Sequence, residues 1–160
     1  MKIEVFLILH NIRSLYNVGS IFRTADAAGV SKIFLTGYTP SPRDVFGNFR
    51  KEISKTALGA EKYMPWQKMS DIGGLTEELN GKKVQIVALE QSEKSIDYRK
   101  FRPRFPIALI LGNEVRGISP ELLKKCDKII EIPMRGRKES LNVAVSAGVA
   151  LFRILENTKN

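Results

Sequence analysis

The chain has 160 residues, of which 43% are hydrophobic and 27% are charged. We expect a single globular domain over residues 1–160, since this length and composition exclude a disordered tail or a fibrous repeat. Lys and Arg number 26 against 17 Asp and Glu, which gives a formal net charge of +9. Such a charge predicts a polyanionic partner, either nucleic acid or an anionic membrane surface, or else serves solubility alone.

The cysteine content and the amino terminus indicate the compartment. Cys126 is the only cysteine, so an intrachain disulfide is impossible and a reducing environment is expected. The apolar run from Val5 to Leu9 is short and follows Glu4, so it does not make the core of a signal peptide. No stretch reaches the roughly 18 apolar residues of a membrane span. We expect a cytoplasmic protein that does not bind a membrane.

In the first half of the chain, apolar runs alternate with helical patterns. The run from Ile3 to Leu9 predicts a strand buried on both faces. From Val18 to Ala28 apolar residues recur with helical spacing, and Gly29 predicts the end of that helix. Further along, the patterns predict a strand over 32–36, an exposed loop over 37–48, and helices over 50–58 and 70–79.

The second half continues the alternation. Strands are predicted over 83–89, 106–111 and 128–132. Ser119, Pro120 and Glu121 have the residue types of a helix start, and a last helix is predicted from Leu141 to Glu156. The fold class expected is therefore α/β, with a mostly parallel sheet flanked by helices. Ligands of such folds lie beyond the carboxyl ends of the strands.

Several familiar kinds of site are absent from the sequence. His10 is the only histidine and is expected at the end of a strand, so neither a Ser-His-Asp triad nor a His-rich metal site is supported. The chain has no CxxC, HExxH or GxGxxG pattern. Ile118 stands where a phosphate-binding loop would need a lysine. We expect no metal ion.

Two segments carry polar residues where structure alone does not require them. In residues 11–29, Arg23 lies nearly opposite the apolar stripe of the helix and faces water or a cleft, while Asn17 could cap that helix. In residues 111–119, Glu114 lies in a turn between Gly112 and Gly117, which permit close approach of a ligand. A solvated arginine and an acidic loop are the plain structural alternatives.

A third segment, residues 132–152, contains a helix that is apolar on nearly every side. Such a helix must be buried, either in the core or against a partner subunit. Ser140 is well placed as its N-cap, and Asn142, at a start that we expect to be buried, needs hydrogen-bond partners. An internal hydrogen bond would satisfy Asn142 without a catalytic role.

In order and spacing, these three segments resemble the signature motifs of the SpoU/TrmH family of the SPOUT superfamily, which are RNA ribose 2′-O-methyltransferases. NIRSLYNVGSIFRTADA resembles the first motif, LGNEVRG the second, and IPM followed by SLN the third. The likeness covers nearly the whole chain. It implies an α/β fold with a carboxyl-terminal deep trefoil knot, the cofactor S-adenosylmethionine, and a homodimer. General topology rules alone would have rejected the knot.

The resemblance also implies roles for individual residues. Arg23 matches the arginine assigned to activating the 2′-hydroxyl. Because arginine stays protonated in proteins, we expect it to hold the adjacent phosphate and favour the alkoxide. Asn17 would position Arg23, and the other catalytic residues would orient the substrate, namely Glu114, Ser140 and Asn142. Six residues would surround the cofactor: Leu89, Gly112, Ile132, Met134, Ser140 and Leu141.

The implied RNA partner is tRNA or rRNA, and no appended RNA-binding domain is expected. Residues 1–80 carry a net charge of +2 and residues 81–160 carry +7. We expect the RNA to contact the loop over 37–48 and six basic residues, which are Arg13, Arg102, Arg104, Arg135, Arg137 and Lys138. Phe46, in that loop, is interpreted as core packing, with base stacking as the alternative.

Two other functions stay open. The chain could be an RNA-binding module that keeps the fold without turnover, or a SPOUT enzyme that methylates a base nitrogen. The joint presence of the five expected catalytic residues disfavours the first. The sequence does not distinguish tRNA from rRNA, and it does not indicate which nucleotide is modified.

Overall fold

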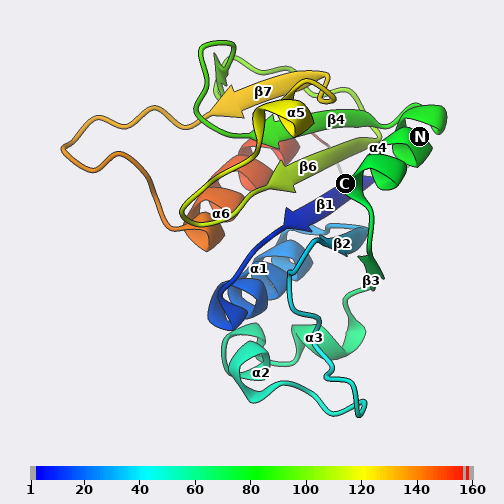
Figure 1. Cartoon of the computed structure of the whole chain (residues 1–160). Coiled ribbons are helices and arrows are strands. Elements are labelled where there is room, and N and C mark those ends of the chain that lie inside the picture. Colours follow the sequence, from blue (N-terminus) through cyan, green and yellow to red (C-terminus); the bar gives the residue numbers. More distant parts are fainter. Residues whose placement is uncertain (1–2, 157, 159–160) are drawn as a thin grey trace.

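The computed structural model describes residues 3–156 and 158. Seven parallel strands form one sheet in the order β3-β2-β1-β6-β4-β7-β5 (Figure 1). The strands are β1 Val5–His10, β2 Lys32–Thr36, β3 Trp66–Met69, β4 Gln85–Leu89, β5 Ile96–Asp97, β6 Ile107–Leu111 and β7 Lys128–Glu131. The predicted α/β class with a parallel sheet is confirmed.

Helices cover both faces of this sheet. They are α1 Leu15–Ala28, α2 Lys51–Ala57, α3 Ala60–Tyr63, α4 Ile72–Gly81, α5 Pro120–Leu123 and α6 Val143–Leu155. Side chains of α1, α2, α3 and α6 pack in one apolar cluster against one face. Those of α4 and α5 pack in a second cluster against the other face. Two layers of helices therefore enclose the sheet, as in other parallel α/β folds.

The central strands are buried on both faces. In β1, Leu7 and Leu9 point into the cluster under α1 and α6, while Ile8 points into the cluster under α4. Alternate residues of a strand point to opposite faces, so a strand covered on both sides must be apolar throughout. This is why the continuous apolar runs of the sequence located β1, β2, β4 and β6 correctly.

Helix α1 begins earlier than its apolar spacing predicted. The N-cap is Ser14, whose hydroxyl accepts a hydrogen bond of 3.2 Å from the backbone N–H of Asn17. The expectation that Asn17 caps the helix is therefore wrong, because Asn17 already lies within the first turn. The predicted stop at Gly29 is confirmed, since Gly29 is the C-cap with a φ of 77°.

Helix α6 also has a different N-cap from the one expected. The side-chain oxygen of Asn142 accepts hydrogen bonds from the backbone N–H groups of Ala144 at 2.9 Å and Val145 at 3.3 Å. Ser140 lies two residues too early to bond the first free N–H groups of a helix that starts at Val143. The assignment of Ser140 as the N-cap is corrected accordingly.

Helix α6 is buried along only one side of its length. Its core-facing residues include Ala147, Leu151 and Ile154, whereas Val145 is 52% exposed and Phe152 is 54% exposed. The sequence predicted burial all round, in the core or against a partner. Within one chain the core covers one side of the helix, and Val145 and Phe152 on the other side are left exposed.

The sequence patterns missed three short elements, α3, β3 and β5. Helix α3 has four residues and β5 has two, so neither shows a full period of apolar spacing. Strand β3 lies at the edge of the sheet, pairs only with β2, and exposes Gln67 and Lys68. Pairing with neighbouring strands defines β3 and β5, and such pairing leaves little mark on the local sequence.

The carboxyl ends of the parallel strands meet at one edge of the sheet. There β1 and β6 are neighbours, and the chain order reverses between them, because β2 continues on one side and β4 on the other. Open parallel sheets bind their ligands at this kind of reversal point. None of the described helices is long and apolar enough to cross a membrane. The trefoil knot stays a prediction.

Candidate active site

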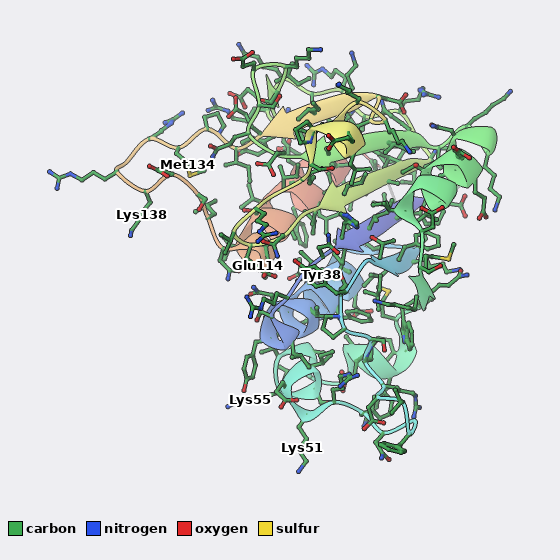
Figure 2. The ribbon with its side chains drawn as sticks, viewed as in Figure 1. Tyr38, Lys51, Lys55, Glu114, Met134 and Lys138 are labelled. Atoms are coloured by element: carbon green, nitrogen blue, oxygen red, sulfur yellow. The ribbon has the colours of Figure 1, made fainter. Side chains whose placement is uncertain are left out.

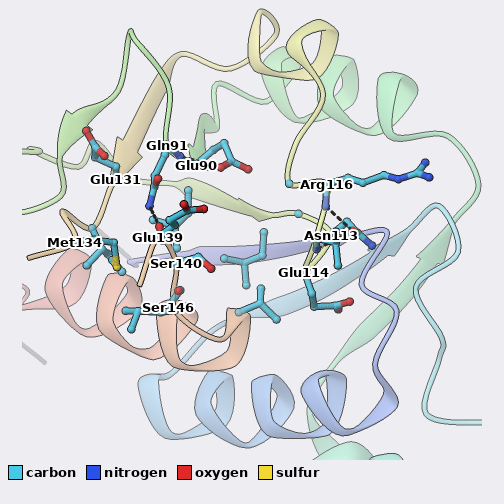
Figure 3. Close-up of a pocket in the computed structure, with 18 residues that line it drawn as sticks. Glu90, Gln91, Asn113, Glu114, Arg116, Glu131, Met134, Glu139, Ser140 and Ser146 are labelled. Carbon is cyan, nitrogen blue, oxygen red and sulfur yellow. Dashed lines mark hydrogen bonds between the residues drawn. The ribbon is translucent and has the colours of Figure 1, made fainter. Parts of the chain in front are cut away.

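A cavity of about 330 Å³ lies beyond the carboxyl ends of β4, β6 and β7. Figure 3 shows that three segments far apart in the sequence surround it. They are the residues after β4, the turn after β6, and the long segment that joins β7 to α6. The cavity therefore lies where the fold class predicted a ligand.

The residues predicted to surround a cofactor come together in this cavity. All six of them line it: Leu89, Gly112, Ile132, Met134, Ser140 and Leu141. Two of the expected catalytic residues, Glu114 and Ser140, line it as well. Leu89 and Leu141 are 52 positions apart in the chain, and the folded sheet brings them to the same cavity.

The turn after β6 is tight because two glycines allow it. A side chain on Gly112 would place its Cβ 2.7 Å from the carbonyl carbon of Gly117. Gly117 has a φ of +65°, which L-residues with a Cβ rarely adopt. Between them, the side-chain oxygen of Asn113 accepts hydrogen bonds from the backbone N–H groups of Val115 and Arg116. The backbone of this turn is thereby fixed along the wall of the cavity.

Glu90, which the sequence did not single out, holds the far end of the same turn. One carboxylate oxygen accepts a hydrogen bond of 2.9 Å from the backbone N–H of Ile118. The next residue, Gln91, donates through its side-chain amide to the carbonyl of Glu139, at 2.7 Å. The sequence signal for both was weak, because a polar pair after a strand is typical of any loop.

Glu114 connects the turn to the start of α1. Its carboxylate accepts hydrogen bonds from the backbone N–H of Arg13, at 2.9 and 3.2 Å, and from that of Ser14 at 3.4 Å. The resemblance implied that Glu114 orients the substrate. In this structure its oxygens bind backbone N–H groups just before the first turn of α1, so Glu114 joins the second motif to the first.

The first and third motifs meet through two asparagines. The side-chain N–H of Asn142 donates a hydrogen bond of 3.0 Å to the side-chain oxygen of Asn17. Asn142 is exposed, and the expectation of a buried helix start is wrong, because the segment before α6 lies on the surface of the chain. The predicted need of Asn142 for hydrogen-bond partners is met by Asn17 and by the first turn of α6.

Arg23 is exposed, as its position opposite the apolar stripe predicted. It lies six residues after Asn17, which is about 9 Å further along a helix. It lines neither this cavity nor the second one described below. The structure therefore brings Asn17, Glu114, Ser140 and Asn142 to one end of the molecule and leaves Arg23 on the outer face of α1.

The three motifs joined by these hydrogen bonds resemble those of a known family. The chain matches the SpoU rRNA Methylase family over residues 4–152. It belongs to this family. A Staphylococcus saprophyticus protein named for the TrmH family of tRNA/rRNA methyltransferases is 33% identical over 153 residues, which is 96% of this chain and 59% of that protein. A Bacillus subtilis protein named for the same family is 32% identical over 149 residues, 93% of this chain and 57% of its own length.

Solved structures of the SpoU/TrmH family have the same fold. An rRNA methyltransferase from Sinorhizobium meliloti aligns with a TM-score of 0.86 at 31% identity, over 98% of this chain and 57% of that one. Its AdoMet-bound form aligns with a TM-score of 0.83. A TrmH/SpoU tRNA modifying enzyme from A. aeolicus aligns with a TM-score of 0.83 at 28% identity, over 97% of this chain and 75% of that one. The resemblance to the family is confirmed, and the chain spans less than two thirds of the curated relatives.

The expected RNA-binding residues of this SpoU family chain fall into separate places. Three of them, Arg135, Arg137 and Lys138, are exposed on the segment between β7 and α6, which projects from the body of the molecule (Figure 1). Arg13 lies beside Glu114 at the cavity edge of the sheet. Arg102 and Arg104 are exposed at the opposite, amino ends of the strands, just before β6 begins.

The aromatic residue of the loop over 37–48 is not part of the core. Phe46 is 85% exposed, so its interpretation as core packing is wrong. The reason is local, because Asp44 accepts hydrogen bonds from the N–H groups of Phe46 and Asn48 and closes a tight loop that points away from the sheet. Phe49 is partly covered by the guanidinium of Arg43, at 4.0 Å from the ring centre.

Burial shifts the pKa values of the single histidine and the single cysteine of this SpoU chain, His10 and Cys126. Partial burial lowers the pKa of His10, which ends β1 as predicted and whose ring lies 2.9 Å from the hydroxyl of Thr36. Burial raises the pKa of the Cys126 thiol to about 12, and Asp127 adds to this effect. Neither residue lines the cavity, so the site itself contains no histidine or cysteine for chemistry.

Proposed function

We propose that this chain transfers the methyl group of S-adenosylmethionine to a ribose 2′-hydroxyl of tRNA or rRNA. One observation carries the proposal: the second and third family motifs line one cavity together with all six residues expected around the cofactor, and Glu114 and Asn142 connect the first motif to them through hydrogen bonds. Membership of the SpoU family and the AdoMet-bound relative support the same cofactor. The cytoplasm, where these RNAs occur, is the proposed location.

The cavity suits such a cofactor by its shape and its lining. Gly112 and Gly117 leave room where a Cβ would meet backbone or the Glu90 carboxylate. Apolar side chains on two sides, from Leu89 and Ile132 among others, can enclose a flat aromatic base. S-adenosylmethionine supplies an activated methyl group bonded to a positive sulfur.

The residues of the chain must hold the acceptor hydroxyl in line with that methyl group and take up its proton. We propose that Ser140, Asn142 and Asn17 position the ribose, because Ser140 lines the cavity and Asn142, two residues further on, is hydrogen-bonded to Asn17. Arg23 holds the neighbouring phosphate and so favours the alkoxide, since its permanent charge suits an anion and not a proton. Glu114 keeps the second motif fixed against α1.

We propose that two copies of this chain pair through the outer face of α6. Val145 and Phe152 lie two turns apart on the exposed side of this helix, with Gly148 and Val149 between them. Contiguous exposed apolar residues on one helix face are typical of a subunit interface. A partner on this face would complete the burial that the sequence of α6 predicts.

The proposed RNA contacts are electrostatic and come from this chain's own residues. Arg135, Arg137 and Lys138 are exposed on the segment that also supplies Met134 and Glu139 to the cavity, and Arg13 lines the neighbouring cavity. Figure 2 shows Lys138 and Met134 on this projecting segment, with Glu114 at the turn nearby. Phosphate contacts release counterions, so RNA affinity should fall steeply as salt increases.

The experiment that tests this function is methyl transfer from labelled S-adenosylmethionine to purified tRNA and rRNA, followed by digestion to nucleosides. Label in 2′-O-methylnucleosides is the expected result, and label on a base would overturn ribose specificity. Calorimetric titration with S-adenosylmethionine separates an enzyme from an inert RNA-binding module. RNA binding without any binding of S-adenosylmethionine would support the module and contradict the proposal.

A further inference from the structure

A second cavity, of about 440 Å³, adjoins the first. The two share one wall, which is the turn made by Asn113, Glu114, Val115 and Arg116. The rest of the second cavity is lined by Arg13 and Tyr38. The family motifs assigned no role to Tyr38 or Arg116, although Tyr38 lies in the loop over 37–48 that we expect to contact RNA. A ligand in the second cavity would therefore lie directly across the turn from the first.

Tyr38 is held at this cavity by contacts at both ends of the residue. Its backbone N–H donates to the side-chain oxygen of Asn11 at 3.1 Å, and its hydroxyl accepts a hydrogen bond of 2.9 Å from the side-chain N–H of Asn113. The turn before it requires Gly37, which has a φ of +61° and whose Cβ would lie 1.8 Å from Asn11. Figure 2 shows Tyr38 beside Glu114.

This fixed tyrosine is nevertheless open to solvent. Its exposed fraction is 58%, although its hydroxyl is bonded within the chain. A rigid aromatic ring with an accessible surface is the usual platform on which an unstacked base lies, and such stacking tolerates any base. Asn113 cannot read a base, because both of its N–H directions and its oxygen are already used within the chain.

The charges around Tyr38 favour an anion. Arg13 and Arg116 are exposed and line the cavity. The only described acid in its lining is Glu114, and the carboxylate of Glu114 accepts hydrogen bonds from the backbone N–H groups of Arg13 and Ser14. Two arginines thus stay available for phosphate oxygens, which they bind well because of their planar, permanent charge.

We propose that the second cavity binds the RNA nucleotide that receives the methyl group. The base of this nucleotide stacks on Tyr38, and its phosphates contact Arg13 and Arg116. This inference rests on the proposed function and adds the site of nucleotide recognition. Only an unpaired nucleotide exposes a base face for stacking, so the substrate position is an unpaired one. The shared turn lets the ribose of the same nucleotide reach the first cavity.

The test compares Tyr38→Ala and Tyr38→Phe with a control, Tyr63→Ala. Tyr63 is also exposed, at 64%, but lies on α3 and lines neither cavity. Binding is measured for a single-stranded decamer of uridines and for an RNA duplex of ten base pairs, and the affinity for S-adenosylmethionine is measured in parallel. Thermal unfolding of each variant shows whether the fold is retained.

We expect Tyr38→Ala to weaken decamer binding roughly tenfold. The affinities for the duplex and for S-adenosylmethionine should change by less than about twofold, and the unfolding temperature should change by only about a few degrees. Tyr38→Phe and Tyr63→Ala should bind the decamer as the unmodified chain does. Equal weakening for decamer and duplex, or no weakening, would overturn the inference. Loss of S-adenosylmethionine affinity would also overturn it, because it would show that the second cavity belongs to the cofactor.

The arginines give an independent readout. Arg116→Ala should reduce the slope of log affinity against log salt by about one, as expected for the loss of one phosphate contact. With the RNA that the chain methylates, Tyr38→Ala should raise KM and leave kcat nearly unchanged. An unchanged KM with intact methyl transfer would sink this inference alone, whereas a wild-type chain without ribose methylation would sink the proposed function.

Discussion

The side-chain amide of Asn142 donates a hydrogen bond to the side-chain oxygen of Asn17 across 125 residues of chain. The same Asn142 caps α6 through its oxygen, with two backbone N–H groups as donors. One side chain therefore starts the last helix and connects it to the first. Its two roles use different atoms, so substitutions can separate them.

Asn142→Asp should keep the cap and lose the contact with Asn17, because a carboxylate accepts hydrogen bonds but does not donate one. We expect its free energy of unfolding to stay within about 0.5 kcal/mol of the unmodified chain, since Asp and Asn cap helices equally well. Methyl transfer should nevertheless fall, because Asn17 is no longer held. Urea denaturation and initial rates measure the two effects.

Asn142→Ala is the matched variant, because it removes the cap and the contact together. It should lose about 1 kcal/mol of stability and also lose activity. Full activity in Asn142→Asp would show that the bond to Asn17 has no functional role and that Asn142 is only a cap.

Gly117→Ala should impair S-adenosylmethionine binding. The added Cβ would lie 2.1 Å from a carboxylate oxygen of Glu90, which also accepts the N–H of Ile118. Either the Glu90 carboxylate or the turn must shift, and both line the cofactor cavity. We expect an affinity loss of at least tenfold by calorimetry.

Gly47→Ala is the control for Gly117→Ala. Gly47 has a φ of +82°, but nothing lies within 4 Å of its Cβ position. Backbone strain should destabilise Gly47→Ala by the same amount, roughly 1 kcal/mol, without any change in S-adenosylmethionine affinity. An equal loss of affinity in both variants would mean that the effect comes from stability and not from the wall of the cavity.

Arg23→Ala should abolish methyl transfer while S-adenosylmethionine binding and stability stay unchanged. The side chain is exposed and lines neither cavity, so neither the cofactor nor the core depends on it. Arg23→Lys should recover only a small part of the activity, because lysine does not offer the planar pair of donors that a phosphate accepts. A fully active Arg23→Ala would remove Arg23 from the mechanism.

Phe152→Glu should convert the proposed dimer into a monomer. It places a charge on the exposed apolar face of α6, and burying an unpaired charge in an interface costs several kcal/mol. Sedimentation velocity of Phe152→Glu and of Phe46→Glu gives the comparison, since Phe46 is also exposed but lies on a distant loop. Dissociation in both variants, or in neither, would contradict the choice of the α6 face.

The sequence located the buried parts of the fold and the members of the site more accurately than the contacts within the site. Continuous apolar runs predicted β1 and β6, because burial is a local property of the sequence, whereas the resemblance to the family is what pointed to Gly112 and Met134. The contacts of Glu90 with Ile118 and of Glu114 with Arg13 are not predictable in this way. They depend on which strand ends lie side by side, and that order follows from the packing of the whole sheet.

The exposed face of α6 shows the complementary difficulty. Its apolar spacing predicted burial, and the single chain leaves Val145 and Phe152 open. Apolar periodicity indicates which residues of a helix are buried, but it does not indicate whether the core or a second chain buries them. Apolar spacing also does not reveal where α1 starts. The start depends on Ser14, which fixes the first turn through one hydrogen bond.

Acidification should destabilise the chain through His10. Asn11 donates its side-chain N–H to one ring nitrogen of His10 at 3.3 Å, and the other nitrogen faces the hydroxyl of Thr36, which suits a neutral ring. Burial lowers the pKa of His10 below its ordinary value of 6.5. The unfolded chain therefore takes up a proton near pH 6.5 that the folded chain resists. The contribution of His10 to stability is complete above that pH and declines as the pH falls towards its folded pKa.

Urea denaturation at pH 7.5 and 5.5 should show a loss in the free energy of unfolding at the lower pH, and this loss should be smaller in His10→Gln. An equal loss in both proteins would assign the pH dependence to other groups.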